Sequence, residues 1–131
     1  MIDHESAMLA YMRLANVSQQ KHQLLGRDKL LVLGAAAACR AGWPDVAERC
    51  RQLILAHNPA HLIGNFSTVA DALRSGDFAP LLKQHERLCG YERAEFLVND
   101  LGLEPAPRPE GGEKTAGEVA FELLEAGSPE C

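Results

Sequence analysis

The longest apolar run of the chain, residues 30–39, constrains the fold more than any other feature of the sequence. The run is about half as long as a membrane-spanning helix, so it predicts a buried helix and no membrane span. Residues 35–38 are all alanine, the strongest helix former, and apolar side chains cover nearly the whole circumference of the expected helix. We therefore expect a helix over residues 28–41 at the buried centre of the molecule.

Apolar side chains recur with helical spacing through most of the remaining sequence before residue 103. Further helices are expected over residues 3–22, 44–57, 68–74, 77–88 and 91–101, separated by short joints. No segment shows a convincing polar and apolar alternation of the kind that a strand needs. The sequence thus predicts an all-α fold, a compact stack of antiparallel helical hairpins with about six helices, followed by a flexible acidic C-terminal tail with one short helix.

Charge divides the 131 residues into a neutral body and an acidic tail. Residues 1–103 hold eleven basic and eleven acidic residues, whereas residues 104–131 hold two and seven and so carry the whole net charge of −5. A neutral body without a basic stripe attracts nucleic acid or an anionic membrane surface only weakly, so neither is expected as a partner. The predicted organisation is a helical domain over 1–103, a Pro/Gly linker over 104–114 and an acidic tail over 115–131.

The tail contains one short amphipathic helix in this prediction. Thr115 and Glu118 have the spacing of a helix-capping box, and apolar residues that include Phe121 and Leu124 follow at helical spacing. A helix of about twelve residues is marginally stable alone in water, so it needs a surface to lie on. The sequence leaves three surfaces open: the body of its own chain, a second copy of the chain, and a different protein.

The N-terminus favours a cytoplasmic location. Residues 1–5 lack the basic start and the apolar stretch of a secretory signal. In that compartment the four cysteines are expected to be reduced thiols that mainly fill space, at Cys39, Cys50, Cys89 and Cys131.

An internal repeat is suggested by residues 38–42 and 72–76, which share Ala, Arg and Gly at a separation of 34 residues, the tetratricopeptide period. The first unit also carries residues at the spacing of such a repeat, namely Gly42, Ala47, Leu55 and Pro59. Residues 28–61 therefore resemble a tetratricopeptide helical hairpin. Residues 62–95 resemble it less well, because Arg93 stands where the family has its closing proline. The resemblance implies stacked hairpins that present a groove.

An alternative for residues 30–34 is a strand that enters a nucleotide-binding turn. The dinucleotide-binding pattern needs glycines where the backbone meets the pyrophosphate, and residues 35–38 are alanines instead. The helical interpretation is therefore preferred.

The histidines and cysteines supply a metal-binding alternative. His85 and Cys89 are four residues apart on one expected helix, so both side chains point the same way and are able to share one zinc ion. His57 and His61 have the same spacing but are separated by Pro59. The preferred interpretation is that these imidazoles are hydrogen-bonded at the edge of the core and that the protein has no cofactor. Zinc is the alternative cofactor.

These features predict a non-catalytic adaptor or scaffold module with a groove for a peptide or partner helix. Large aromatic and apolar side chains are the expected partner-binding residues, because such side chains anchor many interfaces. They are Trp43, Tyr11, Phe66, Tyr91 and Phe96 on the body, expected to be exposed, with Phe121 and Leu124 on the tail. Trp43 is either packed over the next helix or an exposed anchor. Two alternatives stay open: self-association through the C-terminal helix, and a small metal-binding or thiol-dependent protein that uses His85 and Cys89 with His57 and His61.

Overall fold

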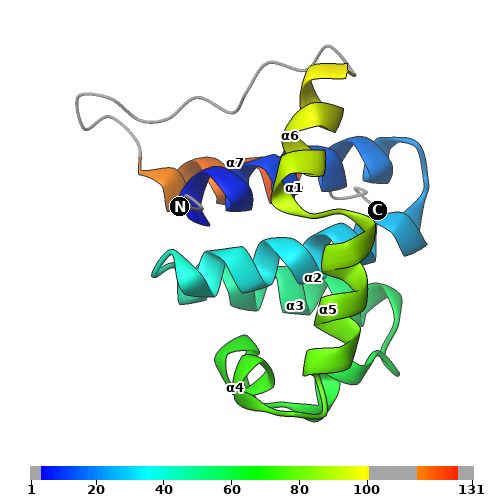
Figure 1. Ribbon diagram of the computed structural model, residues 1–131, viewed down its shortest axis with the longest axis vertical. Coiled ribbons are helices and arrows are strands. Elements are labelled where there is room, and N and C mark those ends of the chain that lie inside the picture. Colours follow the sequence, from blue (N-terminus) through cyan, green and yellow to red (C-terminus); the bar gives the residue numbers. More distant parts are fainter. Residues whose placement is uncertain (1–3, 101–114, 127–131) are drawn as a thin grey trace.

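The computed structural model describes residues 4–100 and 115–126, and every element in these two ranges is helical (Figure 1). The elements are α1 (His4–Gln20), α2 (Leu24–Arg40), α3 (Pro44–His57), the 3₁₀ helix η1 (Leu62–Asn65), α4 (Val69–Arg74), α5 (Ala79–Leu88), α6 (Tyr91–Asp100) and α7 (Ala116–Ala126). The all-α prediction is confirmed. None of these helices combines the length and the apolar character that spanning a membrane requires.

Helix α2 forms the centre of the fold, as its apolar sequence predicts. Residues 31–38 are all buried, and α1, α3, α4 and α5 contact this helix (Figure 1). The alternative that residues 30–34 form a strand is wrong, because these residues lie in the middle of α2. The alanines explain why α2 can occupy the centre of the fold, since small side chains let neighbouring helices approach it closely on several faces.

The turn between α2 and α3 is built by Gly42, as expected. Its φ of +87° is a backbone conformation that a side chain makes costly. The N–H of Gly42 donates to the carbonyl of Cys39 at 3.2 Å, and the N–H of Trp43 donates to that of Ala38 at 2.8 Å. These bonds satisfy the last carbonyls of α2, and Pro44 then starts α3.

The boundary between α1 and α2 differs from the prediction. Helix α1 ends at Gln20, because His22 adopts a positive φ of 58°, and α2 begins at Leu24 rather than at residue 28. An aspartate at the expected start of this helix would normally be exposed. In the structure, Asp28 is only 5% exposed and forms an ion pair with Arg27. The charged pair is therefore inside the structure and not at its edge.

The C-terminal helix α7 packs against α1 and α3, so it lies on the body of its own chain (Figure 1). The hydroxyl of Thr115 accepts the backbone N–H of Glu118 at 3.1 Å, which confirms the predicted helix cap. The predicted linker over 104–114 and the end of the tail, with Cys131, lie outside the described residues.

The two units of the suggested repeat differ in structure. Residues 28–61 contain most of α2 and all of α3, which form a hairpin, whereas residues 62–95 contain η1, α4, α5 and the start of α6. Helix α4 has only six residues, so the second unit lacks a long first helix. Kinship with tetratricopeptide repeats stays a prediction.

Candidate functional site

Tyr11, expected to be exposed, is instead buried. It is 5% exposed, and its hydroxyl donates to the backbone carbonyl of Cys89 at 3.0 Å. Burial also raises the pKa of the phenol above its usual range. Tyr11 therefore ties α1 to the turn between α5 and α6 and is not available to a partner.

The other aromatic candidates of the body divide into one packed and one exposed ring. Phe66 is half-buried and meets Phe78 edge to face, with ring centroids 5.8 Å apart. Phe96 is 60% exposed, which confirms the expectation for this residue. The side chain of Tyr91 lies outside the described part of the structure.

Trp43 lies beneath α7 and is not an exposed anchor. Its indole N–H donates to Glu5 Oε2 at 2.8 Å. Gly117 rests on the ring so closely that a Cβ atom there would lie 2.4 Å from Trp43 Cε3. The glycine is required because any larger residue would push α7 off the indole.

The candidate residues of the tail, Phe121 and Leu124, also belong to the contact between α7 and the body. Leu124 is 5% exposed and Phe121 is half-buried against the core. Asn16 donates from its side chain to the carbonyl of Leu123 at 2.9 Å, and Arg49 pairs with Glu125 at 2.7 Å. A space of only about 10 Å³ remains beneath Leu123 and Leu124, roughly what one water molecule needs. Of the three surfaces left open by the sequence, α7 lies on its own body. We call this surface the α7 docking site, lined on the body by Met12, Ala15, Asn16, Gln19, Arg27, Leu31 and Leu53.

A buried polar cluster next to the α7 docking site was not anticipated from the sequence. Arg27 pairs with Asp28 at 2.8 Å and donates to the side chain of Gln19 and to the carbonyl of Leu53. Asp28 Oδ2 also lies 2.5 Å from His57 Nδ1. The cluster joins α1, α2 and α3, and every one of its charges has a partner, as buried charges require.

The structure brings His85 and Cys89 together in the lining of one groove, whereas His57 and His61 are each engaged with other groups. His57 is engaged with Asp28, and His61 Nδ1 accepts the N–H of Ile63 at 3.1 Å, where it caps η1. His85 is 6% exposed, and its Nδ1 has no hydrogen-bond partner. Desolvation lowers the pKa of His85 and of His61, and it raises the pKa of the Cys89 thiol. Within residues 4–100 and 115–126, no three His, Cys, Asp or Glu side chains gather closely enough to hold a metal ion.

An open groove lies between α2, α5 and α6. Its volume is about 210 Å³. We call it the α2–α5–α6 groove, and it is lined by Gly26, Lys29, Leu30, Leu33, His85, Leu88, Cys89, Arg93 and Leu97.

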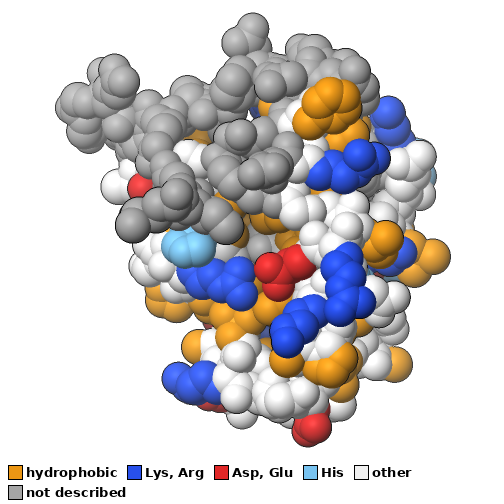
Figure 2. Space-filling view, in the orientation of Figure 1, with side chains coloured by type: hydrophobic (Ala, Val, Ile, Leu, Met, Phe, Trp, Pro, Cys, Tyr) orange, Lys and Arg blue, Asp and Glu red, His pale blue; other side chains and the backbone are white. Residues whose placement is uncertain are grey.

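Three large hydrophobic side chains of the described residues are exposed. Leu25 is 74% exposed, Leu88 is 58% exposed, and Phe96 is 60% exposed. Leu88 lines the groove, whereas Leu25 lies on α2 one helical turn before the groove residue Lys29, and Phe96 lies on α6. Figure 2 shows hydrophobic atoms reaching the surface near Lys and Arg side chains on this part of the molecule. Such clustering is typical of interaction sites.

Comparison with protein-family models, with curated proteins and with solved structures finds no significant match to this chain. The geometry of the described residues therefore carries the functional proposal.

Sequence reasoning missed Leu25 and Leu88 for identifiable reasons. The early start of α2 moves Leu25 out of the pattern of the preceding helix. Leu88 continues the inner stripe of α5 by spacing, but α5 ends at this residue and the chain turns into α6. The position of a helix end relative to its neighbours is a tertiary property, and no local pattern encodes it.

Proposed function

We propose that this protein is a non-catalytic helical interaction module whose α2–α5–α6 groove binds a peptide or a helix of a partner protein. One observation carries the proposal: apolar side chains line most of this groove, among them Leu30, Leu97 and Leu88, and Leu88 is 58% exposed. Exposed apolar surface is costly in water, and its concentration at a concave site favours a binding role over a purely structural one.

The shape of the site supports a helical or extended ligand. The groove runs between three helices, which is the setting in which an amphipathic helix inserts a row of apolar anchors. The chain already binds one such helix, since α7 lies on α1 and α3 through Leu124. The resemblance of residues 28–61 to tetratricopeptide hairpins supports the same class of function.

The partner-binding residues differ from those expected from the sequence. Leu88 lines the groove, whereas Trp43 lies against Gly117 of α7 and Leu124 is buried. The proposal therefore places binding on the body and assigns the tail helix a docking role within the chain.

Selection of helical peptides from a random library on the full-length protein tests this function. Peptides selected on the natural chain are expected to bind the Leu88→Ala variant about tenfold more weakly, because truncating a central leucine of an interface costs about 1–2 kcal/mol.

Ala56→Gln, on the exposed side of α3, is the matched control and is expected to leave the affinity unchanged. Recovery of peptides that bind the natural chain and the Leu88→Ala variant equally well would contradict the proposed site.

A further inference from the structure

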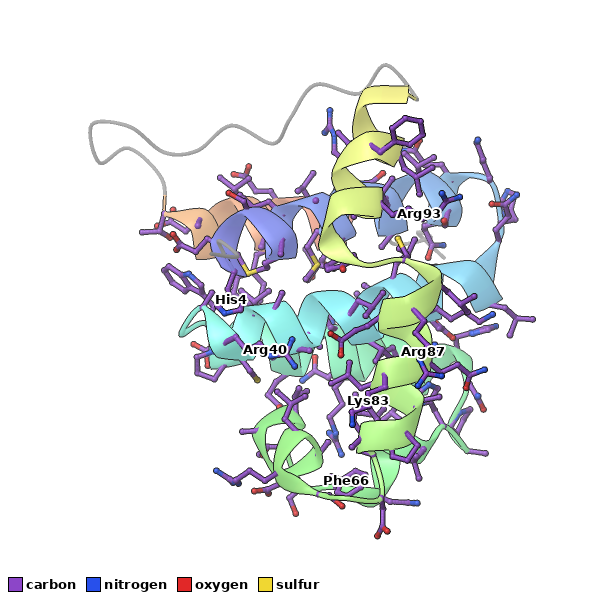
Figure 3. All side chains as sticks on the ribbon, viewed as in Figure 1. His4, Arg40, Phe66, Lys83, Arg87 and Arg93 are labelled. Atoms are coloured by element: carbon purple, nitrogen blue, oxygen red, sulfur yellow. The ribbon has the colours of Figure 1, made fainter. Side chains whose placement is uncertain are left out.

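Among the described residues, the charged side chains that line the α2–α5–α6 groove are positive. They are Lys29 and Arg93. Arg87 is exposed on α5 next to Leu88. Figure 3 shows that Arg87 and Arg93 extend from α5 and α6 on the same side of the molecule. This concentration is local, because residues 1–103 as a whole are neutral.

The described residues provide no ion-pair partner for these cations. Lys29, Arg87 and Arg93 form no ion pair within the described residues, in contrast to Arg27, Arg49 and Arg74, which all do. The nearest acidic residue of α5, Glu86, lines a separate hollow with Tyr11 and Arg40. An acidic ligand in the groove therefore meets unpaired positive charge without displacing an internal contact.

His85 adds a polar group to the groove lining. The side chain is 6% exposed, and no described residue forms a hydrogen bond with its Nδ1. Burial and the charge of Lys29 lower the pKa of this histidine and favour the neutral ring. The positive charge that lines the site thus comes from Lys29 and Arg93, while His85 adds a hydrogen-bonding group.

We infer that the groove binds an amphipathic helix of another protein, in which carboxylates flank the apolar stripe. This inference rests on the proposed function and specifies its ligand. The apolar stripe covers Leu30, Leu88 and Leu97, and the carboxylates pair with Lys29 and Arg93. The α7 docking site has the same arrangement within the chain, because Leu124 is buried there while Glu125 pairs with Arg49.

The α7 helix of a second copy is a less suitable occupant. Its apolar face is already covered, with Val119 6% and Leu124 5% exposed. A second copy would have to release α7 from its own body before offering it to the groove. The helix that fills the groove is therefore assigned to a different chain.

Binding of three synthetic helical peptides to the full-length protein tests the inference. The peptides are about 15 residues long, a length at which an isolated helix begins to be populated, and carry one leucine stripe flanked by Glu, Gln or Lys. The Glu peptide is expected to bind about fivefold to tenfold more tightly than the Gln peptide, and the Lys peptide more weakly than both. The preference is expected to shrink when the salt concentration rises from about 0.05 M to about 0.5 M.

Charge reversal gives the matched pair of variants. Lys29→Glu is expected to remove the preference for the Glu peptide. Arg40→Glu changes the charge of the same helix equally, about 16 Å further along it, and is expected to leave the preference intact. Circular dichroism of both variants checks that each remains folded.

The outcomes separate the inference from the function on which it rests. Equal binding of all three peptides, lost in the Leu88→Ala variant, would overturn the acidic ligand and keep the groove. Binding of none of them would overturn both. A mass that doubles with protein concentration in the natural chain but not in Leu88→Ala would assign the groove to a second copy instead.

Discussion

The α7 docking site and the α2–α5–α6 groove differ in whether their polar groups have partners within the described residues. At the α7 docking site, Asn16 meets the carbonyl of Leu123 and Arg49 meets Glu125, and about 10 Å³ of space is left. In the α2–α5–α6 groove, Lys29, Arg93 and His85 Nδ1 have no such matches, and the volume is about 210 Å³. An occupant of the groove would therefore have to supply the matching polar groups that α7 supplies at its docking site.

The largest expected effect concerns the charge beneath α7. Asp28→Asn removes the ion-pair partner of Arg27, whose side chain lines the α7 docking site, and leaves a buried cation uncompensated. We expect the free energy of unfolding in urea to fall by about 3 kcal/mol. Asp77→Asn, at an exposed position, is the control and is expected to change it by less than about 0.5 kcal/mol. If both variants lost the same free energy of unfolding, the buried polar cluster would not stabilise the α7 docking site.

Leucine truncation compares the two surfaces directly. Leu124→Ala removes a buried side chain of α7 and is expected to cost about 2 kcal/mol, whereas Leu88→Ala removes one that is 58% exposed and is expected to cost less than about 0.5 kcal/mol. Trp43, the single tryptophan, reports on the difference, because its indole lies beneath α7. Its emission is expected to shift to longer wavelength only in Leu124→Ala. A shift in Leu88→Ala would contradict the expectation that Leu88 does not help to hold α7 on the body.

Glycine substitution is expected to change stability in opposite directions on the two surfaces. Gly117→Ala places a methyl group against the Trp43 ring and is expected to destabilise the protein by about 1–2 kcal/mol. Gly26→Ala, at the start of the open groove, meets nothing within 4 Å and is expected to stabilise α2 by about 0.5 kcal/mol. Thermal unfolding followed by circular dichroism measures both. A lower melting temperature for Gly26→Ala would mean that the open groove is more tightly packed than the structure indicates.

The smallest expected effect concerns the ion pair at the rim of the α7 docking site. Arg49 and Glu125 are partly exposed, so their coupling free energy is expected to be below about 1 kcal/mol. A double-mutant cycle with Arg49→Ala and Glu125→Ala measures it in urea, and high salt is expected to reduce it further. A coupling that persists in high salt would indicate that the pair has a larger role than aligning α7.

The helical fold was predictable because its information is local. The apolar circumference of residues 30–39 identified the central helix, Gly42 fixed the turn after it, and Thr115 fixed the start of α7. Each of these depends on residues within one or two helical turns, which is the range over which spacing and capping act.

The candidate site was only partly predictable because exposure depends on packing between distant segments. Tyr11 is hidden by a contact with Cys89, and Trp43 is covered by Gly117, both far away in the sequence. The position of Asp28 inside the fold depends equally on Arg27 and on His57 of another helix. Periodicity shows which residues share a helix face but does not show which neighbour covers that face.

The hydrogen bond from Asn16 to Leu123 has a consequence for the order of folding. It joins residues that are 107 positions apart, so forming it closes nearly the longest loop that the chain offers. Synthesis proceeds from the N-terminus, and α1, α2 and α3 are complete long before residues 116–126 are made. Until residues 116–126 are synthesised, α7 does not cover this surface on the nascent chain. Trp43, which α7 covers in the complete protein, is then exposed to solvent.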